Sequence, residues 1–308
     1  MDWNGKPYYS LDFYLKQTFG EKIYRVALDG GMSCPNRDGT IGTGGCIFCS
    51  AGGSGDFAAS RLLSITEQIE QEKQKIQQKR HCNRFIAYFQ AYTNTYAPIE
   101  TLHRLFTEAI SHPDIAVLSI ATRPDCLDES VLALLEELNQ KKPVWIELGL
   151  QTMHDNTADF IHRGYPLSVY QDTVIRLKRR NLPIITHIIL GLPYESEADM
   201  LATIAYLNQI GCDGIKLQLL HILRGTQLAK LYQKEPFPIF TQEEYLSVLI
   251  HCLEHLSPHT VIHRVTGDGP KDLLLAPLWS QNKRGVLNSL HREMKLRGTY
   301  QGRRFSCQ

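Results

Sequence analysis

Three cysteines lie close together near the start of the chain, in the stretch CPNRDGTIGTGGCIFC at residues 34–49. Cys46 and Cys49 form a CxxC pair, which a tight turn can bring onto one metal centre. Cys34 would reach the same centre from the far side of the loop, and the four glycines between it and Cys46 allow the backbone to fold back. The residue types and their spacing therefore predict a metal site with three thiolate ligands.

Three ligands leave such a site open at one position. A structural zinc site would need a fourth ligand from elsewhere, and His81 or Cys82 are candidates. A four-iron cluster would instead keep one iron without a protein ligand, where another molecule can bind. The loop residues alone do not decide between these two kinds of site.

The segments that must position this loop alternate along a chain of 308 residues, 43% of them hydrophobic. Short runs that are almost continuously apolar are typical of parallel strands buried on both faces. They alternate with longer amphipathic runs that predict helices, the first of them capped by Thr66. The predicted strands span 22–28, 84–90, 115–121, 144–150, 182–190 and 213–220, and the predicted helices span 66–80, 99–110, 128–140, 167–180 and 195–210.

This alternation predicts an α/β fold, a partial (β/α)6 barrel of the TIM type. The cysteine loop follows the first predicted strand, so it would lie at the carboxyl-terminal mouth, where such barrels place their active sites. Beyond the barrel the pattern becomes mostly helical. We expect an N-terminal segment (1–20), a core (21–235) and a basic C-terminal extension (236–308) packed on the core.

The cysteine loop, with Phe48 directly before its last cysteine, resembles the radical S-adenosylmethionine (SAM) superfamily. The usual spacing there is CxxxCxxC, whereas eleven residues separate Cys34 from Cys46 here. This long spacing and five further motifs resemble the branch close to the radical SAM half of the Elongator catalytic subunit. In chain order, within residues 20–235, the motifs are ATRPDCL, ELGLQT, IHRGYP, HIILGLPYES and ILRGTQL.

The resemblance implies a radical SAM enzyme with one [4Fe-4S] cluster, and with SAM bound at the iron that the protein leaves open. It implies Cys34, Cys46 and Cys49 as cluster ligands. The other five cysteines share no close spacing, which disfavours a second cluster. The residues expected to contact the cofactors are Phe48, Gln90, Tyr92, Gln151, Arg163 and His187.

Some of these residues have specific expected roles. The resemblance implies that Gln151 and His187 face the SAM ribose and that Arg163 pairs with the SAM carboxylate. A histidine on a buried strand is also a common core residue, which is the alternative for His187. For Glu147, the alternative to a site role is an ion pair with a basic neighbour inside the barrel.

Positive charge gathers in three segments, although the net charge of the chain is only +1. They are residues 73–80, residues 176–180, and residues 283–304, where seven Lys and Arg residues face the single acid Glu293. Several such runs predict contact with an RNA backbone, while one run alone is usually a solvated helix face.

The resemblance implies the same substrate class, because the radical SAM part of Elongator acts on the C5 substituent of the wobble uridine in tRNA. It implies conversion of carboxymethylaminomethyl toward aminomethyl uridine, with tRNA and an electron donor such as flavodoxin or ferredoxin as partners. The alternatives are a radical SAM enzyme for a small molecule, of the porphyrinogen-oxidase type, and a zinc-binding RNA protein. Without an apolar run of membrane-span length or a signal-peptide pattern, we expect a cytoplasmic protein with no membrane partner.

Overall fold

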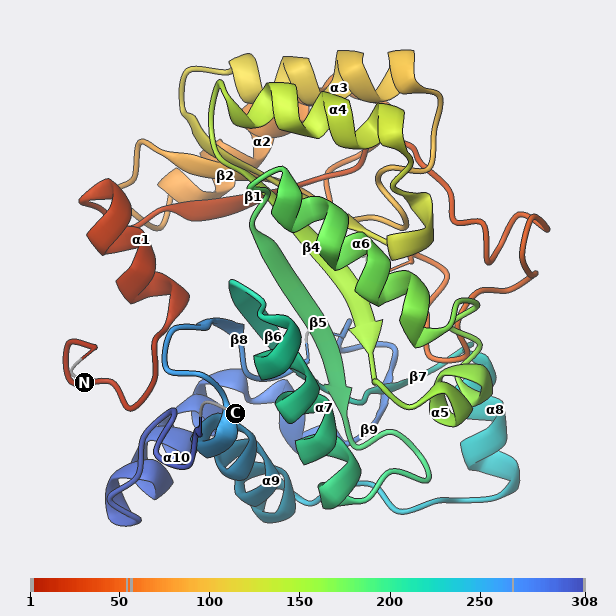
Figure 1. Ribbon diagram of the computed structural model, residues 1–308, viewed down its shortest axis with the longest axis vertical. Helices are drawn as coiled ribbons and strands as arrows, with labels where there is room; N and C mark the ends of the chain where they lie inside the picture. The colour runs from red at the N-terminus through yellow and green to blue at the C-terminus, as the bar shows by residue number, and fades with distance from the viewer. Residues whose placement is uncertain (1–2, 54, 56–57, 268, 307–308) are drawn as a thin grey trace.

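The computed structural model describes residues 3–53, 55, 58–267 and 269–306. Its centre is a curled sheet of seven parallel strands whose spatial order follows the chain (Figure 1). The strands are β1 (Tyr24–Leu28), β2 (Phe85–Phe89), β3 (Ile115–Thr122), β4 (Val144–Gln151), β5 (Ile184–Leu190), β6 (Gly214–Leu219) and β8 (Val261–Arg264). The predicted partial α/β barrel is confirmed, with one more strand than the six expected.

The connecting helices cover the outer face of the sheet (Figure 1). In α3, for example, Leu102, Leu105, Phe106 and Ala109 share one face and are all buried, as expected for an amphipathic helix packed on a sheet. The helices in these connections are α2 (Ile65–Gln77), α3 (Ile99–Ser111), α4 (Glu129–Asn139), α5 (Asp155–Phe160), α6 (Leu167–Arg179) and α7 (Glu197–Ile210).

The helix starts show how local sequence fixes these elements. Ser196 caps α7, and its backbone N–H donates to the Asp199 carboxylate, which completes a capping box. The same arrangement starts α2, with Ser64 as the cap and Glu67 as its partner. The prediction of Thr66 as this cap is wrong, because Thr66 lies one residue inside α2 and bonds to Glu108 on α3.

The C-terminal extension is mostly helical, as expected, and it also completes the sheet. Strand β8 pairs with β6, with Gly214 opposite Val261, and forms the seventh strand. A second, two-stranded sheet joins β7 and β9. The remaining elements are α1 (Leu11–Phe19), β7 (Ile222–Leu223), α8 (Gln227–Lys234), α9 (Gln242–His255), β9 (Leu274–Ala276) and α10 (Lys283–Leu296), with short 3-10 turns at Pro124–Cys126 and Leu278–Gln281.

Inside the barrel, every strand of the seven-stranded sheet contributes one side chain to a polar layer. Lys216 Nζ donates to Tyr88 Oη at 3.0 Å, and Arg25 Nη2 lies 3.0 Å from His263 Nδ1. Because polar groups in a core lose their hydration, they must bond to one another, and these do. The layer consists of Arg25, Tyr88, Ser119, Glu147, His187, Lys216 and His263.

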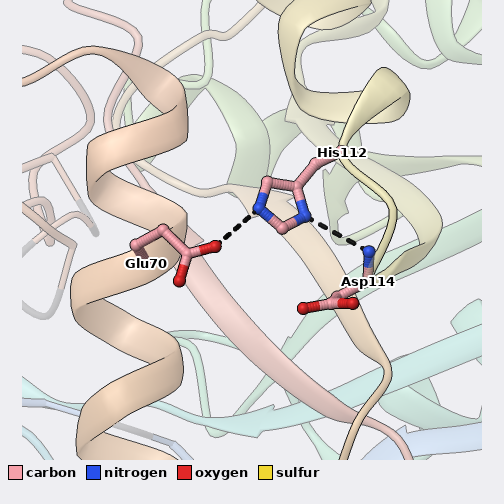
Figure 2. Close-up of side chains that lie close together, drawn as sticks. All are labelled: Glu70, His112 and Asp114. Carbon is pink, nitrogen blue, oxygen red and sulfur yellow. Dashed lines mark hydrogen bonds and ion pairs between the residues drawn. The ribbon is translucent and has the colours of Figure 1, made fainter.

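A separate cluster of ionisable groups ties α2 to the segment before β3, on the outside of the barrel (Figure 2). His112 Nε2 lies 2.8 Å from Glu70 Oε1, while His112 Nδ1 accepts from the Asp114 backbone N–H at 3.2 Å. Among the residues that the structure describes, this is the group of three whose possible metal-ligand atoms lie within 4.8 Å of one another. However, Lys73 bridges both carboxylates, at 2.8 Å from Glu70 and 2.5 Å from Asp114. The Lys73 ammonium group already supplies the positive charge that a metal ion would bring, so the cluster is an ion-pair clamp.

No helix in the described part of the chain combines the length and the apolar composition that crossing a bilayer requires.

Candidate active site

The three cysteines lie in the loop that leaves the carboxyl end of β1, as predicted (Figure 1). The loop is held by its own backbone: the Cys49 N–H donates to the Cys46 carbonyl at 2.9 Å and the Arg37 N–H donates to the Cys34 carbonyl at 2.8 Å. Gly45 has a φ of 80°, and a Cβ there would come within 2.8 Å of Arg37 Nε. A glycine is therefore required where the loop passes the Arg37 side chain.

Two of the three thiols interact with each other, and two arginine cations lie near Cys49. The Cys46 thiol is hydrogen-bonded to the Cys49 sulfur, which lowers the pKa of Cys49 to about 7 and, with burial, raises that of Cys46 well above its usual value. The positive charges of Arg37 and Arg123 also favour the Cys49 thiolate. Thiolates are the form that binds metal, so the two cations favour metal binding at Cys49.

All nine residues predicted for the site from the sequence line one cavity, which we call the cysteine cavity. Residues separated by more than 150 positions meet there because the carboxyl ends of parallel strands share one edge of the sheet. The cavity is lined by Cys34, Arg37, Cys46, Phe48, Cys49, Gly53, Tyr88, Gln90, Tyr92, Thr93, Ala121, Thr122, Arg123, Glu147, Gly149, Gln151, Arg163, Tyr165 and His187.

Tyr92 joins the end of β2 to the cysteine loop. Its backbone has a φ of 59°, and its hydroxyl donates to the Ala51 carbonyl at 2.6 Å. The Arg37 guanidinium lies 5.5 Å from the centre of the Tyr92 ring and donates to the Ser50 carbonyl at 2.5 Å. Tyr92 therefore packs against the loop, and the cation stacked on it holds the backbone beside Cys49.

Arg163 is buried, with 1% of its surface exposed, and most of its donors are used within the protein. Nε donates to the Tyr165 carbonyl at 2.9 Å, Nη1 donates to two carbonyls at the end of β4, and Nη2 pairs with Asp155 at 3.0 Å. The guanidinium has five N–H donors, so one remains. The structure thus shows Arg163 fixing the turn after β4, and its pairing with SAM stays a prediction.

Gln151 sits at the end of β4 in the left-handed region, with a φ of 63°. Its Oε1 accepts from the Tyr165 hydroxyl at 3.4 Å, and that hydroxyl also donates to the Gly149 carbonyl at 2.6 Å. Non-glycine residues with positive φ often lie at functional sites, where the surrounding structure supports the strain. Its position at the cavity wall fits a ligand-binding role.

His187 and Glu147 face each other inside the barrel. His187 Nε2 lies 2.8 Å from Glu147 Oε2, and Glu147 also pairs with Lys216 and with Arg25, the latter at 3.5 Å. Burial would raise the pKa of Glu147, but the charges of Lys216 and Arg25 hold it well below its usual value. For Glu147, the ion pair with basic neighbours is what the structure shows.

The same surroundings keep His187 neutral. Burial and then the charge of Lys216 lower the pKa of His187 to about 4, against the opposing effect of Glu147. Its Nδ1 lies 3.4 Å from Gln218 Nε2. His187 is therefore both a bonded core residue and part of the cavity wall.

The geometry disfavours a structural zinc site closed by His81 or Cys82. These two residues precede β2, at the amino-terminal edge of the sheet, whereas the cysteine loop lies at the carboxyl-terminal edge. In a tetrahedral Zn–thiolate site, the sulfur atoms are about 3.8 Å apart. Among the described residues, the sulfur atoms of Cys34, Cys46 and Cys49 do not all lie within 4.8 Å of one another, so their arrangement does not match a tetrahedral zinc site.

Three charged residues at this site are absent from the set predicted from the sequence: Arg37 and Arg123, which line the cavity, and Lys216, which pairs with Glu147 in its wall. Arg123 is 8% exposed, bonds to Asp125 through Nε and Nη2, and stacks 4.8 Å from the Tyr165 ring centre. The sequence did contain a signal for Lys216. It is the single cation in an apolar strand and therefore requires a buried partner, and Glu147, the single acid in the apolar strand β4, is the matching candidate.

Comparison with known proteins identifies related sequences over most of the chain. A family model described as the Radical SAM superfamily matches residues 38–207, and one described as the Radical_SAM C-terminal domain matches residues 212–296. The uncharacterized protein YtqA of Bacillus subtilis is 43% identical over 300 residues, which cover 97% of this chain and 93% of YtqA.

More distant matches extend the comparison. A tRNA uridine(34) acetyltransferase of Methanocaldococcus jannaschii is 22% identical over 171 residues, which cover 54% of this chain and 31% of that protein. Among solved structures, the archaeal Elp3 of Methanocaldococcus infernus superposes with a TM-score of 0.68 at 14% identity. The superposition covers 91% of this chain and 64% of the Elp3 chain, and this likeness supports the partial-barrel fold.

Proposed function

Since the chain belongs to the radical SAM superfamily, we propose that it modifies the C5 side chain of the wobble uridine in tRNA, with Cys34, Cys46 and Cys49 as its cluster ligands. The protein is an enzyme whose cofactors are a [4Fe-4S] cluster and SAM. The supporting observation is that all three thiols line one cavity together with the other six residues proposed for the site. When bound, the reduced cluster and SAM supply a 5′-deoxyadenosyl radical, which abstracts hydrogen from the substrate.

The residues around the cavity would hold these groups in place. Arg37 and Tyr92 fix the backbone beside Cys49, and Arg123 supplies a buried positive charge near the thiolates. Phe48, Gln90, Gln151 and His187 would contact SAM, while Arg163 keeps the turn after β4 in position. An electron donor of the flavodoxin or ferredoxin type would reduce the cluster.

Relatives support tRNA as the substrate. One of the matched proteins is, by its name, an acetyltransferase for uridine 34 of tRNA. We infer that the present enzyme acts on the same nucleoside and converts carboxymethylaminomethyl toward aminomethyl uridine. Abstraction of a hydrogen atom from the carboxymethyl CH2, loss of one electron to an oxidised flavodoxin or ferredoxin partner, and hydrolysis of the resulting imine by water would release glyoxylate and leave the primary amine.

The surface of α10 supports contact with an RNA backbone. Arg284, Arg292, Lys295 and Arg297 are exposed on or next to this helix. Its first residue, Lys283, lies near enough to His221 at the mouth of the barrel to lower the pKa of that histidine. The helix thus begins near the mouth, and its exposed cations can contact phosphates, although Arg292 and Arg297 also lie 3.7 and 4.0 Å from Glu293.

The two other basic segments are largely used within the protein. In residues 176–180, Arg176 pairs with Asp172 at 2.8 Å and Arg180 pairs with Glu129 at 2.5 Å. In residues 73–80, Lys73 belongs to the ion-pair clamp and Lys75 pairs with Glu72 at 2.6 Å. For most of these cations, structural pairing is the better interpretation.

The cofactor part of the proposal is tested by anaerobic purification, iron analysis and a deoxyadenosine assay. We expect about four iron atoms per chain and reductive cleavage of SAM. Replacing Cys34, Cys46 or Cys49 by alanine should abolish both, while Cys82→Ala should abolish neither. Stoichiometric zinc without iron would contradict the cluster assignment.

The substrate is tested by comparing the tRNA nucleosides of a deletion strain with those of its parent. We expect carboxymethylaminomethyl uridine to accumulate, and expect the wild-type gene, but not a Cys46→Ala variant, to reverse this. Purified enzyme should convert the accumulated nucleoside in isolated tRNA. Unchanged nucleosides, together with active SAM cleavage, would favour a small-molecule substrate instead.

A further inference from the structure

We propose that a cavity at the amino-terminal end of the barrel binds a purine nucleoside of the guanosine type, and that Trp145 and His263 recognise its base. We call this space the lower cavity. It lies at the opposite end of the strands from the cysteine cavity and shares no lining residue with it. The inference does not depend on the proposed tRNA substrate.

The lower cavity is built from the beginnings of the strands. Trp145, the second residue of β4, and Gly214, the first residue of β6, both line it. Tyr9 and Phe305, from the two terminal segments, line it as well. The Ile262 N–H donates to the Tyr9 carbonyl at 2.7 Å, which holds the N-terminal segment against β8. The volume of about 350 Å³ lies within the range of about 300–1,000 Å³ that is typical of small-molecule sites.

Aromatic rings form much of the cavity wall. The centre of the Trp145 ring lies 6.0 Å from that of Tyr14 and 5.4 Å from that of His263. Tyr9 lies 6.3 Å from Tyr14, and Phe305 adds a further ring to the lining. Because aromatic groups pack face to face or edge to face, such a wall favours a flat, ring-shaped ligand.

The polar layer fixes the tautomer of His263. Arg25 Nη2 lies 3.0 Å from His263 Nδ1, and a guanidinium has only donors, so Nδ1 accepts. Burial, and then the charge of Arg25, lower the pKa of His263 well below its usual value, so the ring is neutral. A neutral imidazole that accepts at Nδ1 carries its proton on Nε2. His263 therefore presents an Nε2–H donor.

This donor and the indole N–H of Trp145 are both unused. No hydrogen bond joins either of them to another residue in the part of the chain that the structure describes. The fully buried atoms that lack a partner include neither nitrogen, so solvent reaches both. Since Trp145 is only 3% exposed and both residues line the lower cavity, this cavity is where the two donors are accessible. A ligand with two acceptors would satisfy both.

Gly214 keeps the donor edge of His263 open. A Cβ at this position would lie 2.7 Å from His263 Nε2 and 2.8 Å from Cδ2. Any other residue would therefore crowd the Nε2–H group. A glycine within a strand often marks a place where a ligand or another backbone comes close, and here the glycine itself lines the cavity.

Two donors select one type of base edge. Guanine presents two neighbouring acceptors, N7 and O6, whereas adenine presents the acceptor N7 beside the N6 amino group, which is a donor. The N–H groups of Trp145 and His263 thus match the guanine edge. Adenine would place its amino group against one of them.

The charges at the rim favour a nucleoside without phosphate. Among the described residues that line the lower cavity there is no lysine or arginine. Asp213 is exposed at the rim, where its Oδ2 accepts from the Ile184 N–H at 2.8 Å. Lys178, outside the lining, donates to the Ile210 carbonyl. A carboxylate at the rim can accept hydrogen bonds from ribose hydroxyls and repels a phosphate.

The first experiment uses guanosine as the probe and the NMR spectrum of protein labelled with ¹⁵N-tryptophan as the readout. The chain has three tryptophans, and the indole signal of Trp145 is assigned by its loss in Trp145→Phe. We expect guanosine to shift this signal saturably and inosine, which keeps N7 and O6, to bind within threefold. Adenosine and 7-deazaguanosine should bind at least tenfold more weakly. No shift with guanosine, or equal affinity for guanosine and adenosine, would overturn the proposal.

Variants test the two donors by calorimetric titration. His263→Phe keeps a ring but removes the donor and should weaken guanosine binding at least tenfold, while His263→Gln, which keeps an N–H donor, should weaken it less. Trp145→Phe should also weaken binding. Trp279→Phe is its matched control, because the Trp279 N–H donates to the Phe240 carbonyl outside this cavity.

Circular dichroism shows whether each variant is folded. Gly214→Ala, which leaves both donors in place and crowds His263 Nε2, tests the same contact independently and should weaken guanosine binding. Unchanged affinity in folded His263→Phe and Trp145→Phe would show that these groups do not recognise the base.

A last comparison separates a free nucleoside from guanine within a nucleotide or an RNA. Guanosine 5′-monophosphate and the trinucleotide ApGpA are titrated in the same way. We expect both to bind at least fivefold more weakly than guanosine, and we expect Asp213→Asn to reduce this difference. Tighter binding of either phosphate-bearing probe would overturn the assignment to an unphosphorylated nucleoside.

Discussion

Glu147 on β4 is ion-paired with Lys216 on β6, across the intervening strand β5. Both side chains are almost fully buried and belong to the polar layer, and Glu147 itself lines the cysteine cavity. His187 on β5 bonds to the same carboxylate, so three neighbouring strands meet at Glu147. Ion pairs and hydrogen bonds to Glu147 thus hold the strands together at the base of the candidate active site.

Removing one partner of this pair should destabilise the fold strongly. Lys216→Met leaves the Glu147 carboxylate buried with fewer cations, and breaking a buried pair typically costs about 3–5 kcal/mol of unfolding free energy. The double variant Lys216→Met with Glu147→Gln should lose less than the sum of the two single variants. Guanidinium denaturation of the metal-free protein measures all three. Additive losses would contradict a direct pairing.

Stability should fall between about pH 6.5 and pH 4. His187 and His221 have pKa values of about 4 in the folded protein, because burial and neighbouring cations disfavour the protonated rings. In the unfolded chain they titrate near 6.5, so below that pH the unfolded state binds protons that the folded state does not. Each histidine then contributes up to about 1.4 kcal/mol per pH unit.

Denaturation at several pH values checks this dependence. His221→Gln should reduce the slope between pH 6.5 and 4 by about one proton relative to the wild type. The contribution is fully present above pH 6.5. A slope that is the same in His221→Gln and in the wild type would rule out this origin.

The charge of Arg123 should set part of the cluster's reduction potential. A cation near the thiolates stabilises the reduced, more negative cluster, so Arg123→Met should shift the potential downward, on the order of 60 mV, which corresponds to about 1.4 kcal/mol for one electron. Asp125→Asn, which removes the partner of Arg123, should shift it upward. Potentiometric titration followed by electron paramagnetic resonance measures both. Shifts of the same sign would argue against a charge effect.

Exposed cations of α10 should contribute to tRNA binding. Arg292→Ala with Lys295→Ala should weaken binding, and the slope of log affinity against log salt should fall by about 1 for each phosphate that these side chains neutralise. Lys79→Ala with Arg80→Ala removes the same charge from the exposed segment that follows α2 and serves as the matched control. Filter binding over a salt series distinguishes them. Equal effects of the two double variants would indicate that only the total charge matters.

The sequence was sufficient to predict the six core strands, since their apolar runs are long and a buried parallel sheet has a distinctive pattern. It was not sufficient for β8, whose four residues VIHR are short and half polar. Their strand conformation depends on the free edge of β6, which is a tertiary effect. Ser64 was missed as a cap although Glu67 stands three residues later, as a capping box requires.

The site shows the same division between local and long-range information. Gln90, Gln151 and His187 could be expected at one mouth, because each lies at or near the carboxyl end of a predicted strand. His221 could not, because no local pattern shows that Gly267 and Gly269 pack on its imidazole ring. That contact joins residues more than 40 positions apart and becomes visible only in three dimensions.

The strict agreement between chain order and strand order has a consequence for biosynthesis. As the polypeptide leaves the ribosome, each new strand can add to the edge that the previous one has just formed, so the sheet can grow in one direction without rearrangement. The thiol-bearing loop emerges early, and the wall with Arg264 emerges late. Translation would therefore build the cysteine-bearing side of the mouth before the opposite wall.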